Sequence, residues 1–205
     1  SSGVFFKPFE NGADVSVIAG TKYIVGHSDV MMGMITTKDE YWQRIRQSAS
    51  ELGANSGPDD VYLALRGLRT IGVRMRQHHE TGLKLASWLE KRPEVDRVLH
   101  PGLTSNPHHK IWKRDFTGAC GLFGVVLKPY PEVALAAMLD GLKLYGMGAS
   151  WGGFESLILL TNPAATRTVT KENWENDGPT LRIHAGLEDS EDLISDLEEG
   201  FERLN

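Results

Sequence analysis

The pattern of hydrophobic and polar positions predicts two short strands and a helix at the start of the chain. Residues 15–20 and 30–36 are runs of small, β-branched and apolar residues, which predict strands buried on both faces. A helix is expected over residues 37–52, with Thr37 as its N-cap and Gly53 as its stop. Continuous apolar strands of this kind favour an α/β domain whose sheet is covered on both faces.

A long helix is predicted next, over residues 58–92. Pro58 is tolerated in a first helical turn, and Pro93 ends the helix. Apolar and small residues recur along one predicted face, at Val61, Leu65, Leu68, Gly72 and Met75. A helix of this length is unusual in a globular domain, so it is predicted to connect two lobes.

Beyond Pro93, short strands alternate with helices, which predicts a second α/β or α+β lobe with its own core. The expected strands are Val95–Leu99, Gly121–Leu127, Ser156–Leu160 and Leu181–Ala185. The expected helices are Pro107–Phe116, Pro131–Leu139 and Ser190–Leu204.

Composition and charge exclude several classes of protein. The chain has 205 residues and a net charge of −5, without the clustered Lys and Arg of a nucleic-acid binder. No run approaches the roughly 18 apolar residues of a membrane span. The single cysteine, Cys120, excludes an intramolecular disulfide framework and a multi-cysteine metal site, and favours a reducing compartment.

The first candidate for chemistry is Lys22, which stands at the end of an apolar strand beside Thr21. Burial disfavours the ammonium form, which makes a lysine amine nucleophilic enough to form a Schiff base. The Thr21 hydroxyl could contact a phosphate oxygen. Taken singly, Lys22 is more simply explained as an exposed residue at a strand end, and Thr21 alone carries no information.

Two further candidates lie in the second lobe. Residues 146–156 are rich in glycine, so the backbone there can approach a ligand closely, and Ser150 and Trp151 stand in the middle of this segment. Alternatively, Trp151 is simply a hydrophobic anchor. Arg182 lies within an apolar strand: it either faces solvent with His184, or it is buried and binds a carboxylate bidentately.

The other candidates have simpler explanations. The adjacent pairs His78-His79 and His108-His109 do not face the same way on a helix, so no metal site is expected. Core packing accounts for three methionines, Met31, Met32 and Met34, and a solvated or interface helix face accounts for four arginines, Arg66, Arg69, Arg74 and Arg76.

The segment from Asp14 to Ser28 resembles the lysine-attachment signature of the Cys/Met-metabolism family of pyridoxal-phosphate (PLP) enzymes. That signature is an acidic residue, an apolar residue, three free positions, two small residues, Thr-Lys, an aromatic residue, an aliphatic residue, a free position and Gly-His-Ser. Every constrained position is filled, by Asp14, Val15, Ala19, Gly20, Thr21, Lys22, Tyr23, Ile24, Gly26, His27 and Ser28. The resemblance implies that Lys22 is the catalytic, PLP-binding lysine, that Thr21 contacts the cofactor phosphate and that His27 is architectural.

The same resemblance gives roles to the later candidates. It implies that Ser150 and Trp151 meet the substrate carboxylate and face the cofactor, and that Arg182 binds the substrate α-carboxylate. The form Ser150-Trp151-Gly resembles the β-lyase branch, since γ-acting relatives typically carry Ser-Leu-Gly. Ala19 also resembles that branch, because the γ-acting relatives usually carry a phosphate-binding Ser there.

The resemblance further implies an α/β protein of PLP-dependent fold type I, the aspartate-aminotransferase type. Residues 1–57 would be the C-terminal part of the PLP-binding large domain, residues 58–92 the connecting helix and residues 93–205 the small C-terminal domain. The implied activity is PLP-dependent β-elimination from cystathionine or a similar sulfur amino acid, which gives a thiol, pyruvate and ammonia. A γ-acting enzyme and a non-catalytic remnant are the alternatives.

The length and the start of the chain acquire a meaning from the resemblance. The family has roughly half its chain before the attachment lysine, whereas Lys22 is close to Ser1 and the chain has no initiator Met. The chain is therefore predicted to lack an N-terminal half, which carries much of the PLP site and would be its partner. A homotetramer and a cytoplasmic location are also expected.

Overall fold

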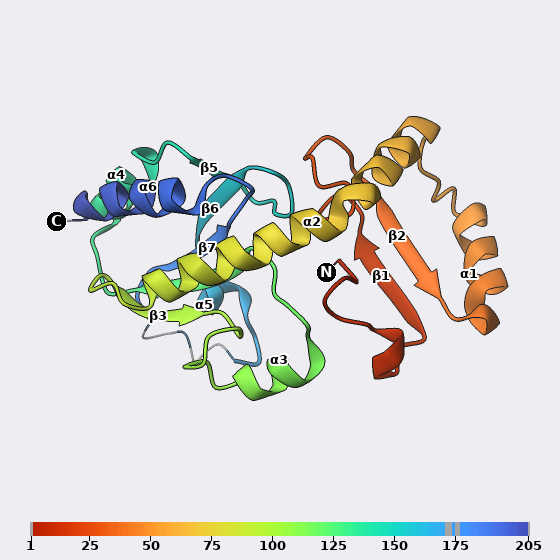
Figure 1. The fold of residues 1–205 in the computed structure, drawn as a ribbon, viewed down its shortest axis with the longest axis horizontal. Coiled ribbons are helices and arrows are strands. Elements are labelled where there is room, and N and C mark those ends of the chain that lie inside the picture. The colour runs from red at the N-terminus through yellow and green to blue at the C-terminus, as the bar shows by residue number, and fades with distance from the viewer. Residues whose placement is uncertain (1, 171–173, 175–176, 205) are drawn as a thin grey trace.

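The computed structural model describes residues 2–170, 174 and 177–204 (Figure 1). A two-stranded sheet with one helix stands at one end of the molecule, and a five-stranded sheet with its own helices stands at the other. Before these, a 3₁₀ turn covers Phe9–Asn11. The strands are β1 (Val15–Ala19), β2 (Gly33–Thr37), β3 (Val95–Leu99), β4 (Leu122–Leu127), β5 (Tyr145–Met147), β6 (Ser156–Thr161) and β7 (Thr180–His184). The helices are α1 (Asp39–Glu51), α2 (Pro58–Leu89), α3 (His109–Asp115), α4 (Glu132–Asp140), α5 (Pro163–Thr166) and α6 (Ser190–Glu202).

The strands β1 and β2 form an antiparallel ladder from Val15↔Thr37 to Ala19↔Gly33. Both strands were predicted. The prediction that they are buried on both faces is wrong, because Val17 is 73% and Ile35 46% exposed. Among the described residues, these two strands form a sheet with no third strand, and α1 is the helix that packs on β2. Met31, expected in the core, is also exposed, since it lies in the connection ahead of β2.

The ends of α1 follow the prediction at one end only. Thr37 is not the N-cap: its hydroxyl donates to the Lys38 carbonyl at 2.9 Å, and Lys38 occupies the cap position. At the other end Gly53 follows the helix with a φ of +67°, the left-handed conformation that glycine adopts without strain. The predicted stop at Gly53 is therefore confirmed.

The helix α2 links the two sheets (Figure 1). Its first half does not bury the predicted apolar face, because Val61, Leu65 and Leu68 are exposed. The small residues Ala64 and Gly67 face inward instead. A small side chain is needed there, because a Cβ atom on Gly67 would lie 2.3 Å from the Ile24 carbonyl oxygen. The turn that follows Lys22 therefore rests directly on the α2 backbone.

Arg74 corrects the prediction that the arginines of this helix are all solvated. Its side chain is buried, and its guanidinium donates to the carbonyls of Tyr23 (2.8 Å), Gly67 (2.8 Å) and Ile24 (3.3 Å). The other three arginines, Arg66, Arg69 and Arg76, are exposed as predicted. Arg74 thus fixes the turn after Lys22 to α2 through backbone carbonyls, which a sequence pattern cannot reveal.

We expect Gly67→Ala to destabilise the protein by about 3 kcal/mol, because the new methyl group would overlap two backbone carbonyls that cannot move independently of the Lys22 turn. Gly72→Ala is the matched control in the same helix, since the nearest atom to its Cβ is the tip of Arg76, at 3.9 Å. There the better helix propensity of alanine should stabilise the fold by up to about 1 kcal/mol. Chemical unfolding measures both, and equal effects of the two substitutions would contradict the close packing.

The five-stranded sheet has the strand order β3-β4-β7-β6-β5 and is antiparallel except between β5 and β6. The helices α2, α4 and α6 pack together at this end of the molecule, with α2 against β3 and β4. Their apolar side chains join those of the sheet in one core, which includes Leu85, Leu89, Phe123, Val125, Leu127, Met138, Ile158, Leu181, Ile183, Leu193, Leu197 and Phe201. Because side chains alternate along a strand, Arg182 and His184 project from the opposite face of β7.

The predicted strands and helices of this lobe are all present, with ends shifted by a few residues. Two short elements were not predicted, β5 and α5. No helix in the described ranges is long and apolar enough to cross a membrane. The division into residues 1–57, 58–92 and 93–205 stays a prediction.

Candidate active site

Lys22 lies on a tight turn that follows β1. The turn is closed by backbone hydrogen bonds from Lys22 N to the Ala19 carbonyl (3.2 Å) and from Gly26 N to the Lys22 carbonyl (2.8 Å). The Lys22 side chain is half-buried, as predicted. Its amine donates to Ser150 Oγ at 2.8 Å and lies 4.4 Å from the centre of the Trp151 ring. The turn therefore presents the amine to a hydroxyl and an indole from a loop far along the chain.

The loop that carries Ser150 and Trp151 lies on the backbone of the Lys22 turn. Gly152 has a φ of +81°, and a Cβ atom there would lie 2.8 Å from Tyr23 N and 2.9 Å from the Lys22 carbonyl carbon. Only glycine permits this close approach. The sequence predicted that these glycines let the backbone approach a ligand, and at Gly152 the backbone approaches the Lys22 turn of the protein itself.

Arg182 completes the group. It lies between Gly124 of β4 and Leu159 of β6 in the sheet. Its side chain shares a face of β7 with His184, but it is half-buried, because residues 148–153 lie over this face. Its guanidinium is 3.3 Å from the Gly148 carbonyl and 3.4 Å from the Ser150 carbonyl, and its central carbon is 5.8 Å from the Trp151 ring centre.

Polar atoms in this group are left free to bind a ligand. Among the residues that the structure describes, Arg182 forms no ion pair with a carboxylate. The Trp151 Nε1 is buried and has no hydrogen-bond partner in the same part of the chain. The site thus offers the Lys22 amine, the Ser150 hydroxyl and the Arg182 guanidinium, whose two described bonds to carbonyls are long. These groups suit a ligand that carries a carboxylate and a group that reacts with an amine.

Thr21 neighbours this group but is bonded elsewhere. Its hydroxyl accepts a hydrogen bond from Met32 N at 2.9 Å and donates to the Met32 carbonyl at 3.2 Å. Thr21 therefore ties the Lys22 turn to the strand connection ahead of β2. Its hydroxyl proton faces the protein backbone rather than Lys22.

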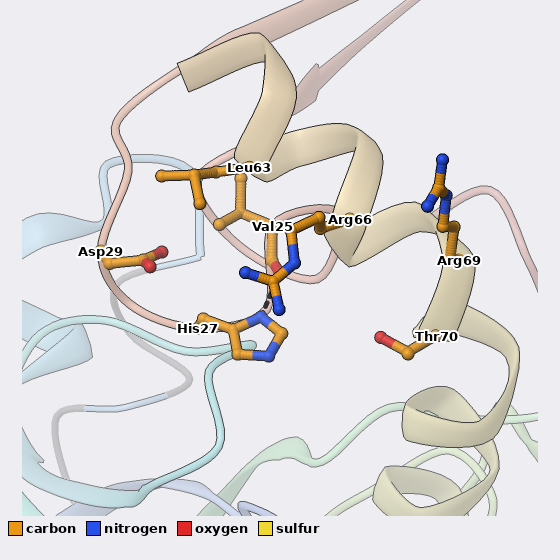
Figure 2. A pocket seen from close by; sticks show the side chains of 7 residues that line it. All are labelled: Val25, His27, Asp29, Leu63, Arg66, Arg69 and Thr70. Carbon is orange, nitrogen blue, oxygen red and sulfur yellow. Dashed lines mark hydrogen bonds between the residues drawn. The ribbon is translucent and has the colours of Figure 1, made fainter. Parts of the chain in front are cut away.

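A separate cavity of about 300 Å³ lies between the segment that follows Lys22 and the first half of α2 (Figure 2). It is lined by Val25, His27, Asp29, Leu63, Arg66, Arg69 and Thr70. Figure 2 shows the Arg66 guanidinium above the His27 ring, whereas Arg69 points away. The His27 Nδ1 donates to the Val25 carbonyl at 2.7 Å, so this ring supports its own backbone turn.

Sequence reasoning missed two histidines beside the site, His78 and His184. Both are buried, and the His184 Nε2 accepts a hydrogen bond from Gly152 N at 3.0 Å. Burial lowers the pKa of both rings, that of His184 to about 3, so both are neutral at physiological pH. Within the described ranges, no group of three or more His, Cys, Asp or Glu side chains could hold a metal ion.

The fold and the site together define a class of protein: an α/β protein that brings a lysine amine, a serine hydroxyl and an arginine guanidinium together beside an indole ring. Residues 1–202 match the family model described as "Cys/Met metabolism PLP-dependent enzyme". The chain belongs to this family, whose members use PLP, and the predicted family and cofactor are confirmed.

Three relatives illustrate the range of the family. The chain is 46% identical over its whole length to the cystathionine beta-lyase MetC of Escherichia coli, of which it covers 52%. It is 43% identical to the L-alanine/L-glutamate racemase of Wolbachia pipientis, with 98% of this chain and 50% of that protein covered. The crystal structure of cystathionine gamma synthase from Xanthomonas oryzae matches 98% of this chain and 52% of its own, with 36% identity and a TM-score of 0.87.

These matches confirm the predicted fold class, PLP-dependent fold type I. The chain spans about half the length of the curated relatives it matches. Their names are those of a beta-lyase, a gamma synthase and a racemase, so the family alone does not select one reaction.

Proposed function

We propose that this chain is part of a PLP-dependent carbon–sulfur lyase that cleaves L-cystathionine or a similar sulfur amino acid by β-elimination. The products are a thiol, pyruvate and ammonia. The observation that carries the proposal is the contact of the Lys22 amine with Ser150 Oγ at 2.8 Å, above the Trp151 ring and next to Arg182. Four residues to which the resemblance gives roles lie together, although they come from three separate segments.

Lys22 would hold the cofactor covalently through its amine. When bound, PLP supplies an electron sink for negative charge at the substrate α-carbon. Once its amine is free, Lys22 removes the proton from that carbon as a general base. The hydroxyl of Ser150 holds the amine in place, and the Trp151 ring stabilises its charged form through a cation–π contact.

Arg182 and Ser150 would bind the substrate α-carboxylate. A guanidinium offers two parallel donors to a carboxylate, and the two long bonds to backbone carbonyls leave donors of Arg182 available. Thr21 is proposed as a contact of the cofactor phosphate. That contact requires its hydroxyl proton to turn from the Met32 carbonyl toward the phosphate.

We propose elimination at the β-carbon of the substrate, rather than at the γ-carbon, because of two residues of this chain. Trp151 stands where γ-acting relatives typically carry leucine, and Ala19 stands where they carry a phosphate-binding serine. A racemase would use the same proton removal at the α-carbon without loss of a leaving group. The substrate and its products therefore discriminate among the three reactions.

We further propose that residues 1–205 act together with a segment equivalent to the other half of the relatives, and call the two together the complete enzyme. The exposed apolar side chains of β1, β2 and α1 support this, since Val17, Ile35 and Trp42 are 73%, 46% and 51% exposed. Such a surface is suited to packing against further protein. A homotetramer and a cytoplasmic location are part of the same proposal.

The products of the complete enzyme with PLP and L-cystathionine test the reaction. We expect homocysteine and pyruvate in equal amounts, and no 2-oxobutyrate. Release of 2-oxobutyrate and cysteine would instead establish γ-elimination, and conversion of L-alanine to D-alanine without thiol release would establish racemisation. Absence of all three, with no covalently bound PLP, would mean that the chain has no catalytic role.

A further inference from the structure

Three buried side chains with polar groups are neighbours at the Lys22 turn, and the reaction proposed above uses none of them. They are Tyr23, His78 and His184. Each carries one atom without a hydrogen-bond partner among the residues described: Tyr23 Oη, His78 Nε2 and His184 Nδ1. The three side chains are at most 1% exposed. Native proteins seldom leave a buried polar atom unpaired, so three such atoms on neighbouring side chains favour a common partner.

The three rings are neighbours although they come from different elements. The ring centres of Tyr23 and His78 are 5.2 Å apart, those of Tyr23 and His184 are 6.1 Å apart, and those of His78 and His184 are 5.2 Å apart. Tyr23 belongs to the Lys22 turn, His78 to α2 and His184 to the end of β7. The group therefore joins the long helix, the five-stranded sheet and the turn that carries the reactive lysine.

Backbone partners fix the tautomer of each histidine. The His78 Nδ1 faces the Ala185 carbonyl at 2.9 Å, which only accepts, so this nitrogen carries the proton and Nε2 is a bare acceptor. The His184 Nε2 accepts from Gly152 N at 3.0 Å, so its proton is on Nδ1; the Gly153 carbonyl, at 3.4 Å from Nε2, is the weaker contact. Because both rings are neutral, one N–H donor and one acceptor are left over.

Tyr23 supplies a group of both kinds. Burial, and secondarily the adjacent Cys120, raise the pKa of Tyr23 well above its usual range, so its side chain stays a hydroxyl that can donate and accept. The unpaired capacities are thus one donor, one acceptor and one hydroxyl. A single water molecule has the donors and acceptors to match all three, and buried waters typically form about three hydrogen bonds.

We infer that Tyr23, His78 and His184 bind one buried water in common, and that this bridged triad positions Lys22 against the Ser150–Trp151 loop. The water accepts from His184 Nδ1, donates to His78 Nε2 and forms its third bond with the Tyr23 hydroxyl. The inference deepens the proposed function and rests on it. The three residues are positioning residues, since the hydrogen bond of Lys22 Nζ is to Ser150 Oγ and not to any of them.

The position of the triad explains why it would matter for the reaction. Tyr23 follows Lys22 directly in the chain. His184 accepts a hydrogen bond from the backbone N–H of Gly152, the residue after Trp151. His184 also stands two residues after Arg182 on the same face of β7. A shift of the triad would therefore move the amine, the loop and the guanidinium relative to one another.

Tyr23→Phe in the complete enzyme tests the positioning. We expect kcat to fall about tenfold, with KM for L-cystathionine changed less than twofold, because misplacement of a proton-transfer group slows the chemical step. Exchange of the substrate α-proton with deuterated water should slow by the same factor, since it reports proton removal by Lys22 directly. Unchanged kcat and unchanged exchange, with only a lower Tm, would overturn the positioning role.

Tyr145→Phe is the matched control. The Tyr145 hydroxyl is also buried without a partner in the described part of the chain, but it belongs to the core beneath the helices. Its removal should leave kcat and proton exchange unchanged. An equal loss in both variants would show that any buried hydroxyl has this effect and would contradict the triad.

A second variant tests whether the residues share one partner. His78→Asn keeps a donor for the Ala185 carbonyl and removes the Nε2 acceptor. If one water joins the residues, adding His78→Asn to Tyr23→Phe should lower kcat and Tm much less than the product or sum of the single effects. Fully independent effects would overturn the shared water.

The readouts separate this inference from the proposed function. Non-additive shifts in Tm would support the bridged triad even if the complete enzyme released no thiol. Absence of thiol release would refute only the proposed reaction. Thiol release by the unaltered enzyme together with additive Tm shifts would refute only the triad.

Discussion

Lys22→Ala in the complete enzyme should lower kcat for thiol release by about 10⁴-fold, because the substitution removes both the covalent link to PLP and the base that takes the α-proton. The protein should still fold, since Lys22 is half-buried and Ser150 is the one hydrogen-bond partner of its side chain among the residues described. Borohydride reduction followed by peptide mass analysis should find PLP attached at residue 22 in the unaltered enzyme and nowhere in the variant.

Lys22→Arg is the control for charge. Arginine keeps a cation above the Trp151 ring and a donor for Ser150, but it stays protonated and cannot attach PLP or act as a base. We expect the same loss of kcat as for alanine with a smaller loss of stability. Substantial turnover by either variant, or PLP attached to another lysine, would contradict the assignment of Lys22.

The local elements were predictable because their signals are local. Short apolar runs, a helix-stopping Gly53 and a Pro at the start of α2 act within a few residues, and the corresponding elements are present. In the second lobe the two unpredicted elements are also its shortest, since β5 has three residues and α5 has four. A strand as short as β5 has no periodicity of its own and is stabilised by pairing with β6.

Burial was less predictable than secondary structure. Val17 and Ile35 have strand-like side chains, yet what covers a strand depends on distant parts of the fold. Arg74 shows the opposite error, because its partners are the carbonyls of Tyr23 and Ile24, about fifty residues earlier. No spacing rule links these positions, since any residue type supplies a carbonyl.

The candidate site was predictable in its residues but not in its geometry. A resemblance singled out Lys22, Ser150, Trp151 and Arg182, and the structure brings them together across 128 residues between Lys22 and Ser150. Thr21 was the exception: its hydroxyl bonds Met32, a contact that the sequence does not indicate. The two buried histidines were missed because neither stands in a pattern associated with chemistry.

Arg182→Lys should raise KM for L-cystathionine about 50-fold in the complete enzyme while kcat falls much less. The lysine keeps the positive charge but loses the planar fork that binds both oxygens of a carboxylate, and such charge-assisted bonds contribute about 1.5–3 kcal/mol. PLP should remain attached to Lys22, because Arg182 lies against the Gly148 and Ser150 carbonyls and forms no bond with the lysine.

Arg97→Lys is the matched control within the same sheet. Arg97 lies on β3 and pairs with Asp96 and Asp177, so it already has carboxylate partners and lies at the sheet edge. Its replacement should leave KM unchanged.

A substrate analogue that lacks the α-carboxylate tests the role of Arg182 directly. The unaltered enzyme should bind this analogue far more weakly than the amino acid, whereas Arg182→Lys should bind the two almost equally. If Arg182→Lys still bound the amino acid much more tightly than the analogue, another group, such as Ser150, would bind the carboxylate. Only replacement of the residue that recognises the carboxylate can abolish this difference in affinity.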